Sequence, residues 1–294
     1  MILVVGATGL LGSEICRRLP GAGHSVRALV RASSAGEKVE AFQAAGIATA
    51  VADLKDPDSL ARACAGVSAV ISTASSTLSR QEGDSIETVD RQGQLHLIDA
   101  AKRAGVRQFV YVSIPPDAHY DYPLFRAKRE VETALARSGM EYTVLQANYF
   151  MEVWLSPALG FDYANGRATV YGNGERPIAW VSYRDVAGFA VDALGNGATR
   201  NRVLLVGGPE NLTPLQVVRV FEEVTGRSFT VEHVPQGALE KQYADATNPL
   251  SQTFAALMLE YTHGSPMDMR ETLDLMPRPL TTIRDYAATA GRIS

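Results

Sequence analysis

The sequence predicts an α/β protein built on a doubly wound parallel sheet, with a smaller α+β portion at its C-terminal end. Short apolar runs alternate with helix-like segments through the first half of the chain, which is typical of a parallel sheet covered on both faces. A glycine-rich turn directly follows the first apolar run. After about Asn148 the alternation breaks down, and Gly, Pro, Met and aromatic residues become more frequent.

The first half alternates strand and helix candidates. Leu11, Ile15 and Leu19 share one helical face, which supports the first helix. Asp56 followed by Pro57 is typical of an N-cap with proline at the first helical position. We expect strands at residues 2–5, 26–30, 47–51, 69–72, 109–112 and 142–145, and helices near 10–20, 35–45, 57–65, 85–104 and 123–138.

Regular elements return in the second half, so this half is expected to revisit the first sheet rather than form a detached domain. We expect helices at 183–194, 214–225, 236–245 and 250–262, and strands at 203–206 and 229–233. The predicted division is a sheet domain at 1–148 and a pocket-forming, substrate-binding portion at 149–294, of which about 183–206 returns to the sheet.

Composition and charge disfavour several classes of protein. The 294 residues include 28 Lys plus Arg and 32 Asp plus Glu, a net charge of −4, and no basic run suits nucleic acid. No apolar stretch approaches the ~18 residues of a membrane span, and the N-terminus has no cationic leader. We therefore expect a cytoplasmic protein. The five histidines are scattered, so no metal site is predicted, and Cys16 and Cys64 are expected to be buried thiols.

The turn Val4-Val5-Gly6-Ala7-Thr8-Gly9-Leu10-Leu11-Gly12 predicts a dinucleotide-binding fold of the Rossmann type. Gly6 makes the tight turn, Gly9 lets the backbone approach a pyrophosphate, and Gly12 lets the helix pack closely on the strand. Thr8, Leu10 and Leu11 lie where the helix N-terminus offers N–H groups to phosphates. An unliganded turn is the alternative, but the order strand, glycines, helix favours an NAD(P)-binding domain.

The residue after the second strand selects the nucleotide. An acidic residue there would bind the ribose 2′-OH of NAD, but this strand ends at Arg31, with Ser33 next and Lys38 in the following helix. A guanidinium suits a 2′-phosphate through bidentate hydrogen bonds. A solvated arginine is the alternative. We predict that NADP(H) is preferred over NAD(H).

Two further strand ends supply candidate cofactor contacts. Asp53 and Leu54 follow the third strand, where a carboxylate and a backbone N–H can meet the adenine edge, although Asp53 is equally suited to a turn or cap. The small residues Thr73, Ala74 and Ser75 follow the fourth strand and leave room for the middle of the cofactor.

Lys128 lies on the apolar stripe of its predicted helix. Leu124, Val131 and Leu135 form that stripe by their spacing, and Lys128 falls between them. A lysine in such a position is costly to bury unless its ammonium finds a partner or ligand. The alternative is a lysine that snorkels from the helix edge. We therefore expect the Lys128 ammonium to meet a partner or a ligand.

An ordered series of motifs resembles the atypical short-chain dehydrogenase/reductases, and more specifically the NmrA-like group, which includes NADPH-dependent quinone reductases and isoflavone-reductase-type enzymes. The likeness runs to about residue 240. Its motifs are the glycine turn, Asp53-Leu54, Val89-Asp90-x-x-Gly93, Leu97-Ile98-x-Ala100-Ala101, Gly105-Val106, Phe109 to Ser113, Phe125-x-x-Lys128-x-x-x-Glu132, Tyr142-Thr143-x-Leu145, Gly172-x-Gly174, Arg184 to Ala187 and Gly207 to Glu210.

The resemblance implies that Lys128 hydrogen-bonds the nicotinamide ribose or assists proton transfer, with Glu132 as a potential ion-pair partner. Typical short-chain dehydrogenases carry a proton-donating Tyr four residues before this lysine, where Leu124 stands here. Ser113 keeps the usual serine position, for a substrate oxygen or merely for capping the strand. Tyr122 is the candidate replacement acid. Its neighbours His119 and Tyr120 are further candidates, and each of the three is individually better explained as a surface residue.

The segment after the sixth strand is the candidate substrate pocket, because a doubly wound sheet opens its ligand crevice at the strand ends. Tyr149, Phe150, Met151 and Trp154 would line an apolar slot, with Phe161 and Trp180 as further candidates, and domain core is the alternative for each. Asn148 is a further candidate for cofactor binding. Related enzymes usually have Arg-Pro where Gln146-Ala147 stands.

The sequence therefore favours an NADPH-dependent oxidoreductase that transfers hydride to a small apolar carbonyl, quinone or enone, because such acceptors delocalise the arriving charge and need less acid assistance. The alternative is a non-catalytic, NmrA-like sensor of NADP(H), which the absence of Tyr at position 124 favours. The expected partner is a small molecule rather than nucleic acid or membrane, and a homodimer is compatible with the sequence.

Overall fold

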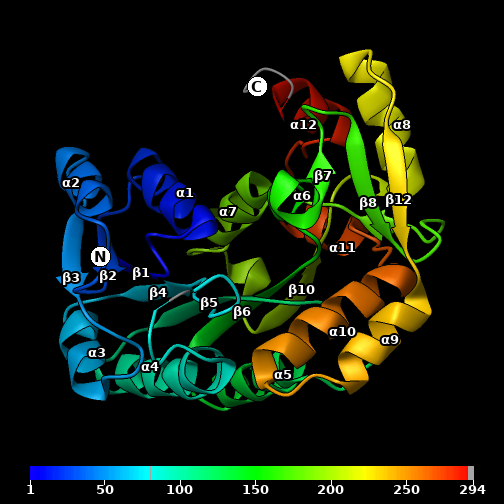
Figure 1. Cartoon of the computed structure of the whole chain (residues 1–294). Coiled ribbons are helices and arrows are strands. Elements are labelled where there is room, and N and C mark those ends of the chain that lie inside the picture. The colour runs from blue at the N-terminus through cyan, green and yellow to red at the C-terminus, as the bar shows by residue number, and fades with distance from the viewer. Residues whose placement is uncertain (80, 291–294) are drawn as a thin grey trace. The chain divides into compact units, whose positions relative to one another are not determined.

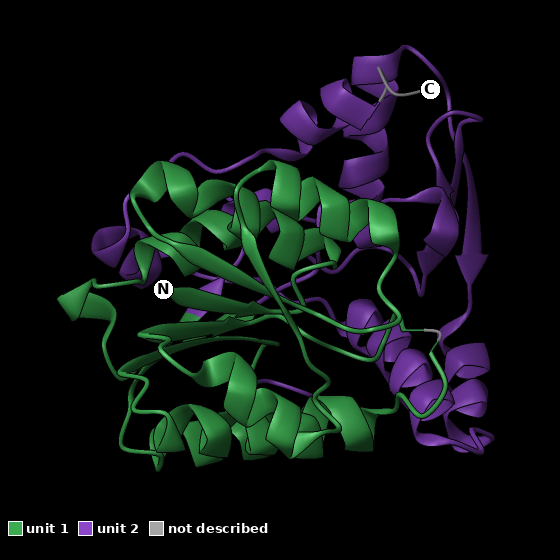
Figure 2. Ribbon diagram, turned by 90° about the vertical axis from the view of Figure 1, so that its left-hand side faces the viewer, with its two compact units in different colours: residues 1–116, 123–146, 186–204 green, residues 117–122, 147–185, 205–294 purple. Residues whose placement is uncertain are grey.

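The computed structural model describes residues 1–79 and 81–290, which divide into two compact units (Figure 2). The first unit comprises residues 1–116, 123–146 and 186–204. The second comprises residues 117–122, 147–185 and the chain from 205 onward. Each unit has a hydrophobic cluster of its own.

The first unit is built on a seven-stranded sheet in the order β10-β6-β5-β4-β1-β2-β3, as traced over the described residues. Strands β1 to β6 pair in parallel throughout, and the register sets Val5 of β1 beside Ser72 of β4. The strand bounds are β1 Ile2–Val5, β2 Val26–Val30, β3 Ala48–Val51, β4 Ala69–Ser72, β5 Gln108–Ser113, β6 Glu141–Ala147 and β10 Arg202–Val206. The Rossmann-type fold class is confirmed.

Helices cover both faces of this sheet, with α1 and α2 on one face and α3, α4 and α5 on the other (Figure 1). Asp56 caps α3 and accepts hydrogen bonds from the N–H groups of Asp58 and Ser59, as its place before Pro57 predicts. The bounds are α1 Leu10–Arg18, α2 Gly36–Ala44, α3 Pro57–Cys64, α4 Gln92–Arg103, α5 Pro123–Ala136 and α7 Tyr183–Asp192.

The helix predicted at 85–104 is divided in the structure. Residues Ile86–Arg91 form a π-helical segment, and α4 begins at Gln92. Ser85 caps the segment in a reciprocal arrangement with Thr88. Apolar spacing does not distinguish the two helix types, so this division escaped prediction. Single-turn π-helices are rare and are frequently found at functional sites.

The second unit is a mixed α+β assembly. Its three-stranded sheet has the order β12-β8-β7, with β12 parallel and β7 antiparallel to β8, and β11 pairs with β9 in an antiparallel ribbon. The strands are β7 Phe161–Asp162, β8 Arg167–Tyr171, β9 Ile178–Ala179, β11 Asn211–Leu212 and β12 Thr230–Val234. The helices are α6 Met151–Trp154, α8 Pro214–Thr225, α9 Gln236–Ala244, α10 Pro249–His263, α11 Arg270–Leu275 and α12 Ile283–Ala290.

Both cysteines are free and buried, as expected. Burial raises the pKa of the Cys16 thiol to about 12 and that of Cys64 to about 11, although the charge of Arg27 opposes the second shift. Reactive cysteines need a stabilised thiolate, so neither position suits thiol chemistry. Among the described residues, no helix combines the length and apolar character needed to cross a membrane.

Replacing Phe109 by Ala tests the core of the first unit. Phe109 lies on β5 with none of its surface exposed, so truncation is expected to lower the free energy of unfolding by about 3–5 kcal/mol. Leu78→Ala is the control, because Leu78 is 65% exposed and should change stability by less than about 0.5 kcal/mol. Urea denaturation measures both variants, and equal effects would contradict the assignment of Phe109 to the core.

Candidate functional site

Two glycines of the turn after β1 are required by contacts with neighbouring backbone. A Cβ on Gly12 would lie 2.2 Å from the carbonyl oxygen of Gly6. Gly6 has a φ of +82°, and a Cβ there would lie 2.7 Å from Thr73 Oγ1 and 2.8 Å from the Ala74 nitrogen. Thr73 also donates hydrogen bonds to the Val5 carbonyl through its N–H, at 2.9 Å, and its hydroxyl, at 3.2 Å.

The start of α1 leaves its first N–H groups available to an anion. Gly9 is the N-cap residue and supplies no side-chain cap. Its own N–H donates to the Gly6 carbonyl at 3.0 Å, which fixes the turn. The N–H groups of Leu10 and Leu11 begin the helix, where intrahelical acceptors are lacking and the dipole favours negative charge. This cradle therefore fits a cofactor pyrophosphate.

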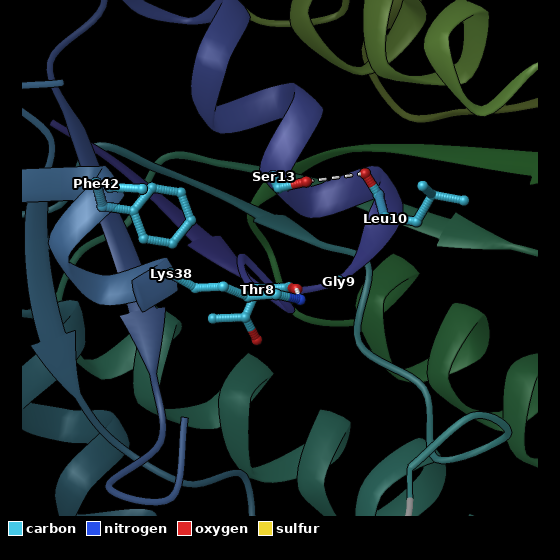
Figure 3. A pocket seen from close by; sticks show the side chains of 7 residues that line it. Thr8, Gly9, Leu10, Ser13, Lys38 and Phe42 are labelled. Atoms are coloured by element: carbon cyan, nitrogen blue, oxygen red, sulfur yellow. Dashed lines mark hydrogen bonds between the residues drawn. The ribbon is translucent and has the colours of Figure 1, made fainter. Parts of the chain in front are cut away.

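A hollow of about 470 Å³ lies beside this turn and extends over α2 (Figure 3). Lys38 projects from α2 and donates to the Thr8 carbonyl at 2.7 Å. A cation at this place adds positive charge next to the helix N-terminus. Lys38 is identified from the sequence as a cation near the end of β2. Ser13, Ala41 and Phe42 are not predicted from it, because their proximity depends on how α1 and α2 lie side by side. The lining residues are Thr8, Gly9, Leu10, Ser13, Lys38, Ala41 and Phe42.

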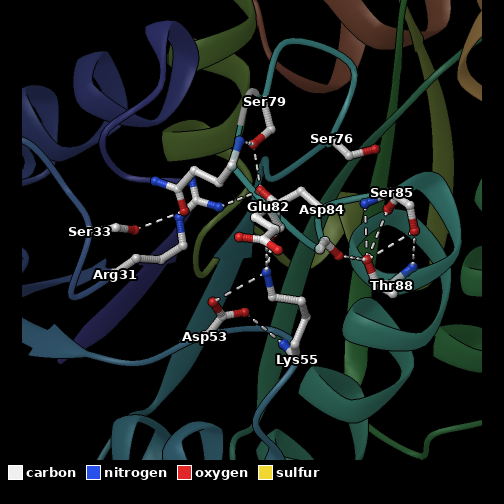
Figure 4. Close-up of polar contacts among 12 residues, drawn as sticks. Arg31, Ser33, Asp53, Lys55, Ser76, Ser79, Glu82, Asp84, Ser85 and Thr88 are labelled. Atoms are coloured by element: carbon white, nitrogen blue, oxygen red, sulfur yellow. Dashed lines mark hydrogen bonds and ion pairs between the residues drawn. The ribbon is translucent and has the colours of Figure 1, made fainter.

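Arg31 is not a free cation at the end of β2. Its Nη1 donates to Asp84 Oδ2 at 2.6 Å, and Lys55 Nζ donates to Asp84 Oδ1 at the same distance (Figure 4). Burial raises the pKa of the Asp84 carboxyl. Hydrogen bonds from Lys55, Ser79 and Arg31 outweigh that effect and hold the pKa below its usual range. Sequence reasoning missed Asp84, which lies 53 residues from Arg31.

Asp53 and Leu54 have local structural roles. Asp53 Oδ1 accepts the N–H of Lys55 at 2.8 Å, which closes a turn of the kind considered as its alternative role. Leu54 is buried in the core of the first unit, and a Cβ on Gly93 would lie 2.7 Å from the Leu54 Cβ. Adenine binding by this pair stays a prediction.

Lys128 is buried on α5, between Leu124 and Val131 as its spacing predicts. Its Nζ donates to the Val112 carbonyl at 3.2 Å and lies 4.8 Å from the centre of the Tyr111 ring. Burial lowers the pKa of Lys128. The charges of Asp90 and Glu132 oppose this shift, and that of Arg129 adds to it. The side chain does not snorkel to the surface.

Glu132 is not the ion-pair partner of Lys128. Its carboxylate accepts from Arg129 Nη2 at 2.7 Å and from Gln146 Nε2 at 3.2 Å. Arg129 also donates to Ser113 Oγ at 3.1 Å. An i, i+3 ion pair with Arg129 of the same helix thus stands in place of the i, i+4 pair that the sequence suggested.

Asp90 is a buried acid in the π-helical segment. Its Oδ2 accepts from the N–H and the hydroxyl of Ser76, at 2.9 and 2.6 Å. Its Oδ1 is buried without a hydrogen-bond partner among the described residues. The sequence placed Asp90 within a motif but assigned it no role. The structure adds that its charge raises the pKa of Lys128 against the effect of burial.

The candidate proton donors around Tyr122 belong to the second unit. Glu260 of α10 holds their loop, because its Oε1 accepts the N–H groups of His119 and Tyr120 and its Oε2 lies 2.9 Å from His119 Nδ1. The His119 and His263 rings stack at 4.1 Å. Tyr122 is buried rather than on the surface.

The predicted substrate residues fall into two sets. Tyr149 and Met151 are buried in the aromatic cluster of the second unit, where the Tyr149 ring lies 4.7 Å from that of Trp154. Phe161 and Trp180 are buried in the same cluster. Phe150 and Trp154 are half-buried. Core packing, the alternative considered for each residue, accounts for the burial of the first set, and substrate contact stays a prediction for Tyr149, Phe150, Met151 and Trp154.

Asn148 carries an unsatisfied acceptor. Its N–H donates to the Val206 carbonyl at 2.9 Å and its Nδ2 to the Ser265 carbonyl at 2.7 Å. Its Oδ1 is buried and makes no hydrogen bond within the described part of the chain. A buried acceptor of this kind calls for a donor from a ligand or an ordered water.

No cluster of potential metal ligands occurs among residues 1–79 and 81–290.

Comparison with known proteins gives consistent matches. The NmrA-like family profile matches residues 1–286. The NAD(P)H azoreductase of Xenophilus azovorans is 30% identical over 98% of this chain and 96% of its own. The photosystem II assembly factor Ycf39 of a Synechocystis strain is 31% identical over 81% of this chain and 72% of its own.

A solved structure shares the fold along the whole chain. The NADPH-dependent quinone oxidoreductase of Escherichia coli, complexed with NADPH, has a TM-score of 0.79 and 24% identity. The match covers 99% of this chain and 99% of that chain. At this level of identity, the match supports the fold.

Replacing Gly12 by Ala tests the close approach of α1 to the turn. The added Cβ would need space held by the Gly6 carbonyl, so the free energy of unfolding should fall by about 1–3 kcal/mol. Gly21→Ala is the matched control, since no atom lies within 4 Å of its Cβ position. If both variants unfold at the same urea concentration as the wild type, the contact is not a constraint.

Replacing Lys128 by Met tests the cost of its buried charge. The folded-state pKa lies below the ordinary value of 10.5, so the unfolded chain binds more protons and stability rises with pH as the pH approaches 10.5. The stability of Lys128→Met relative to the wild type should therefore decline between about pH 7 and about pH 10. Urea denaturation across this range measures it, and a constant difference contradicts the lowered pKa.

Proposed function

The chain belongs to the NmrA-like family, and we propose that it is an NADPH-dependent reductase that transfers hydride to a small, largely apolar carbonyl, quinone or enone. The observation that carries the proposal is the buried Lys128 ammonium at the end of β5, where it donates to the Val112 carbonyl and lies beside the Tyr111 ring. Burying a cation costs free energy, and a ligand that accepts a hydrogen bond would repay part of that cost.

The residues of the first unit suit a dinucleotide from one end to the other. The turn from Gly6 to Gly12 would hold the pyrophosphate, and Arg31 with Lys38 would hold a 2′-phosphate. The small residues Thr73, Ala74 and Ser75 would leave room for the middle of the cofactor, whose nicotinamide supplies the hydride. Asn148, which belongs to the second unit, stays a predicted cofactor contact. On this basis NADPH is preferred over NADH.

Leu124 narrows the chemistry that the site can perform. Its side chain is buried and has no proton to give, so no phenol precedes Lys128 on the helix. A lysine with a lowered pKa is a better proton donor than an exposed one. Lys128 would then bind the acceptor oxygen or the ribose and assist proton delivery. Acceptors that spread negative charge over a conjugated system need the least assistance from it.

Two groups are less suited to proton transfer. Ser113 Oγ accepts from Arg129 Nη2 at 3.1 Å, which favours a binding role for this serine over a catalytic one. Tyr122 stays a candidate acid on its place in the chain alone.

The name of the X. azovorans relative, an NAD(P)H azoreductase, extends the acceptor classes worth testing to azo compounds.

The second candidate function is a non-catalytic sensor of NADP(H). Leu124 in place of a proton donor favours it, as does the similarity to a photosystem II assembly factor. In that case the cofactor site would be retained and Lys128 would affect binding alone. A cytoplasmic location and a homodimer stay predictions from the sequence under both functions.

Single-turnover mixing with NADPH tests the reductase proposal. We expect purified protein to oxidise NADPH with quinones or enones at least ~10-fold faster than with simple ketones, a difference of ~1.4 kcal/mol in barrier. Lys128→Met should slow the reductive step by ~100-fold or more, the lower range for acid–base catalysis. Loss of nicotinamide absorbance measures both rates.

Lys102→Met is the control, because Lys102 is an exposed lysine of α4. Its rate should match that of the wild type. If NADPH binds but no quinone, enone, ketone or azo compound oxidises it above background, and Lys128→Met changes affinity alone, the reductase proposal is wrong and the sensor function is favoured.

A further inference from the structure

A single carboxylate binds the cations that stand at the ends of β2 and β3. Asp84 Oδ2 accepts from Arg31 and Oδ1 from Lys55, both at 2.6 Å, and the Ser79 hydroxyl also donates to Oδ2 (Figure 4). Only 3% of the Asp84 side chain is exposed, against 31% for Arg31 and 29% for Lys55. Charge-assisted hydrogen bonds to a shielded carboxylate resist screening by salt.

The segment that carries Asp84 also binds the next polar residue after β2. We call residues 76–79 and 81–84, which follow β4, the Asp84 loop. Gln81 Oε1 of this loop accepts from the Ser33 hydroxyl at 2.8 Å. At its start, Ser76 is fixed by two hydrogen bonds to the buried Asp90. The loop therefore holds both polar side chains, Arg31 and Ser33, that are suited to a 2′-phosphate.

We propose that Asp84 determines cofactor specificity by competing with the 2′-phosphate of NADPH for Arg31 and Lys55. The inference rests on the proposed function only in taking NADPH as the cofactor. A phosphate monoester carries about −1.5 to −2 charges near pH 7. It would bind an Arg31 guanidinium whose charge is already shared with the Asp84 carboxylate, and it would lie close to that negative charge. The phosphate therefore gains less free energy than it would from an unpaired guanidinium.

NADH does not need to bind Arg31 beside the Asp84 carboxylate, because its ribose carries a hydroxyl in place of the 2′-phosphate. Asp84 therefore lowers the affinity for NADPH relative to that for NADH. Lys38 retains part of the preference for NADPH, since it donates to the neutral Thr8 carbonyl rather than to a carboxylate. The selectivity of the site is thus a balance between Lys38 and an arginine that is already paired.

Asp84→Asn tests the proposal, because asparagine keeps the size of the side chain and an acceptor oxygen but removes the charge. Titration calorimetry with NADPH, NADH, 2′,5′-ADP and 5′-AMP gives the dissociation constants. We expect Asp84→Asn to bind NADPH and 2′,5′-ADP roughly tenfold more tightly. NADH and 5′-AMP should change by less than about threefold.

Glu82→Gln is the matched control, since Glu82 lies on the same loop, is exposed and changes the net charge equally. Its dissociation constants should stay within about twofold of the wild type. Lys38→Met should weaken NADPH in both the wild type and the Asp84→Asn background. If Asp84→Asn does not fold, Asp84→Ser removes the same charge and undergoes the same titrations.

Three outcomes overturn the proposal. Weaker binding of NADPH by Asp84→Asn would mean that Asp84 positions Arg31 for the phosphate. Unchanged binding would mean that the ion pair is irrelevant, and equal tightening of NADPH and NADH would mean that the loop only covers the site. A protein that binds NADPH but reduces no acceptor contradicts the reductase proposal, while the comparison of variants still decides the role of Asp84.

Discussion

The first unit depends on a contact between two stretches of backbone that leaves no room for a side chain. A Cβ on Gly12 would clash with the carbonyl oxygen of Gly6. This approach brings the start of α1 against the end of β1. It also places the first N–H groups of α1, those of Leu10 and Leu11, at the same edge of the sheet as Thr73, Ala74 and Arg31, because parallel strands present their carboxyl ends together.

The buried ammonium of Lys128 at the end of β5 is a second constraint, and it limits which proton transfers the proposed site can assist. Lys128 has the carbonyl of Val112 and the face of Tyr111 for partners, and its pKa is lowered mainly by burial. The acids that temper this shift come from two elements, Asp90 from the π-helical segment and Glu132 from α5. The geometry that makes this lysine costly for folding also makes its proton easier to release.

Local pattern predicted much of the fold, because strand ends, caps and glycine turns are determined within a few residues of chain. The α3 cap at Asp56 and the stripe around Lys128 are examples. The π-helical segment was not predictable, because apolar spacing does not distinguish a π-helix from an α-helix. The pairing of Glu132 with Arg129 was not predictable either, because a carboxylate on a helix can pair at i, i+3 or at i, i+4. The Asp84 bridge depends on a contact with Arg31 across 53 residues, which no local pattern encodes.

The chain alternates between its two units, and this limits how the units can be separated by proteolysis or by truncation of the gene. The segment Asp117–Tyr122 belongs to the second unit although both its neighbours in sequence belong to the first, and the chain passes between the units five times in all. No single cut therefore releases either unit as one continuous polypeptide. Synthesis from the N-terminus must also reach the end of β10, at Val206, before the sheet has its last strand. A gene fragment that ends at residue 148, the end of the sheet domain predicted from the sequence, would encode a sheet without β10 and with an unpaired edge.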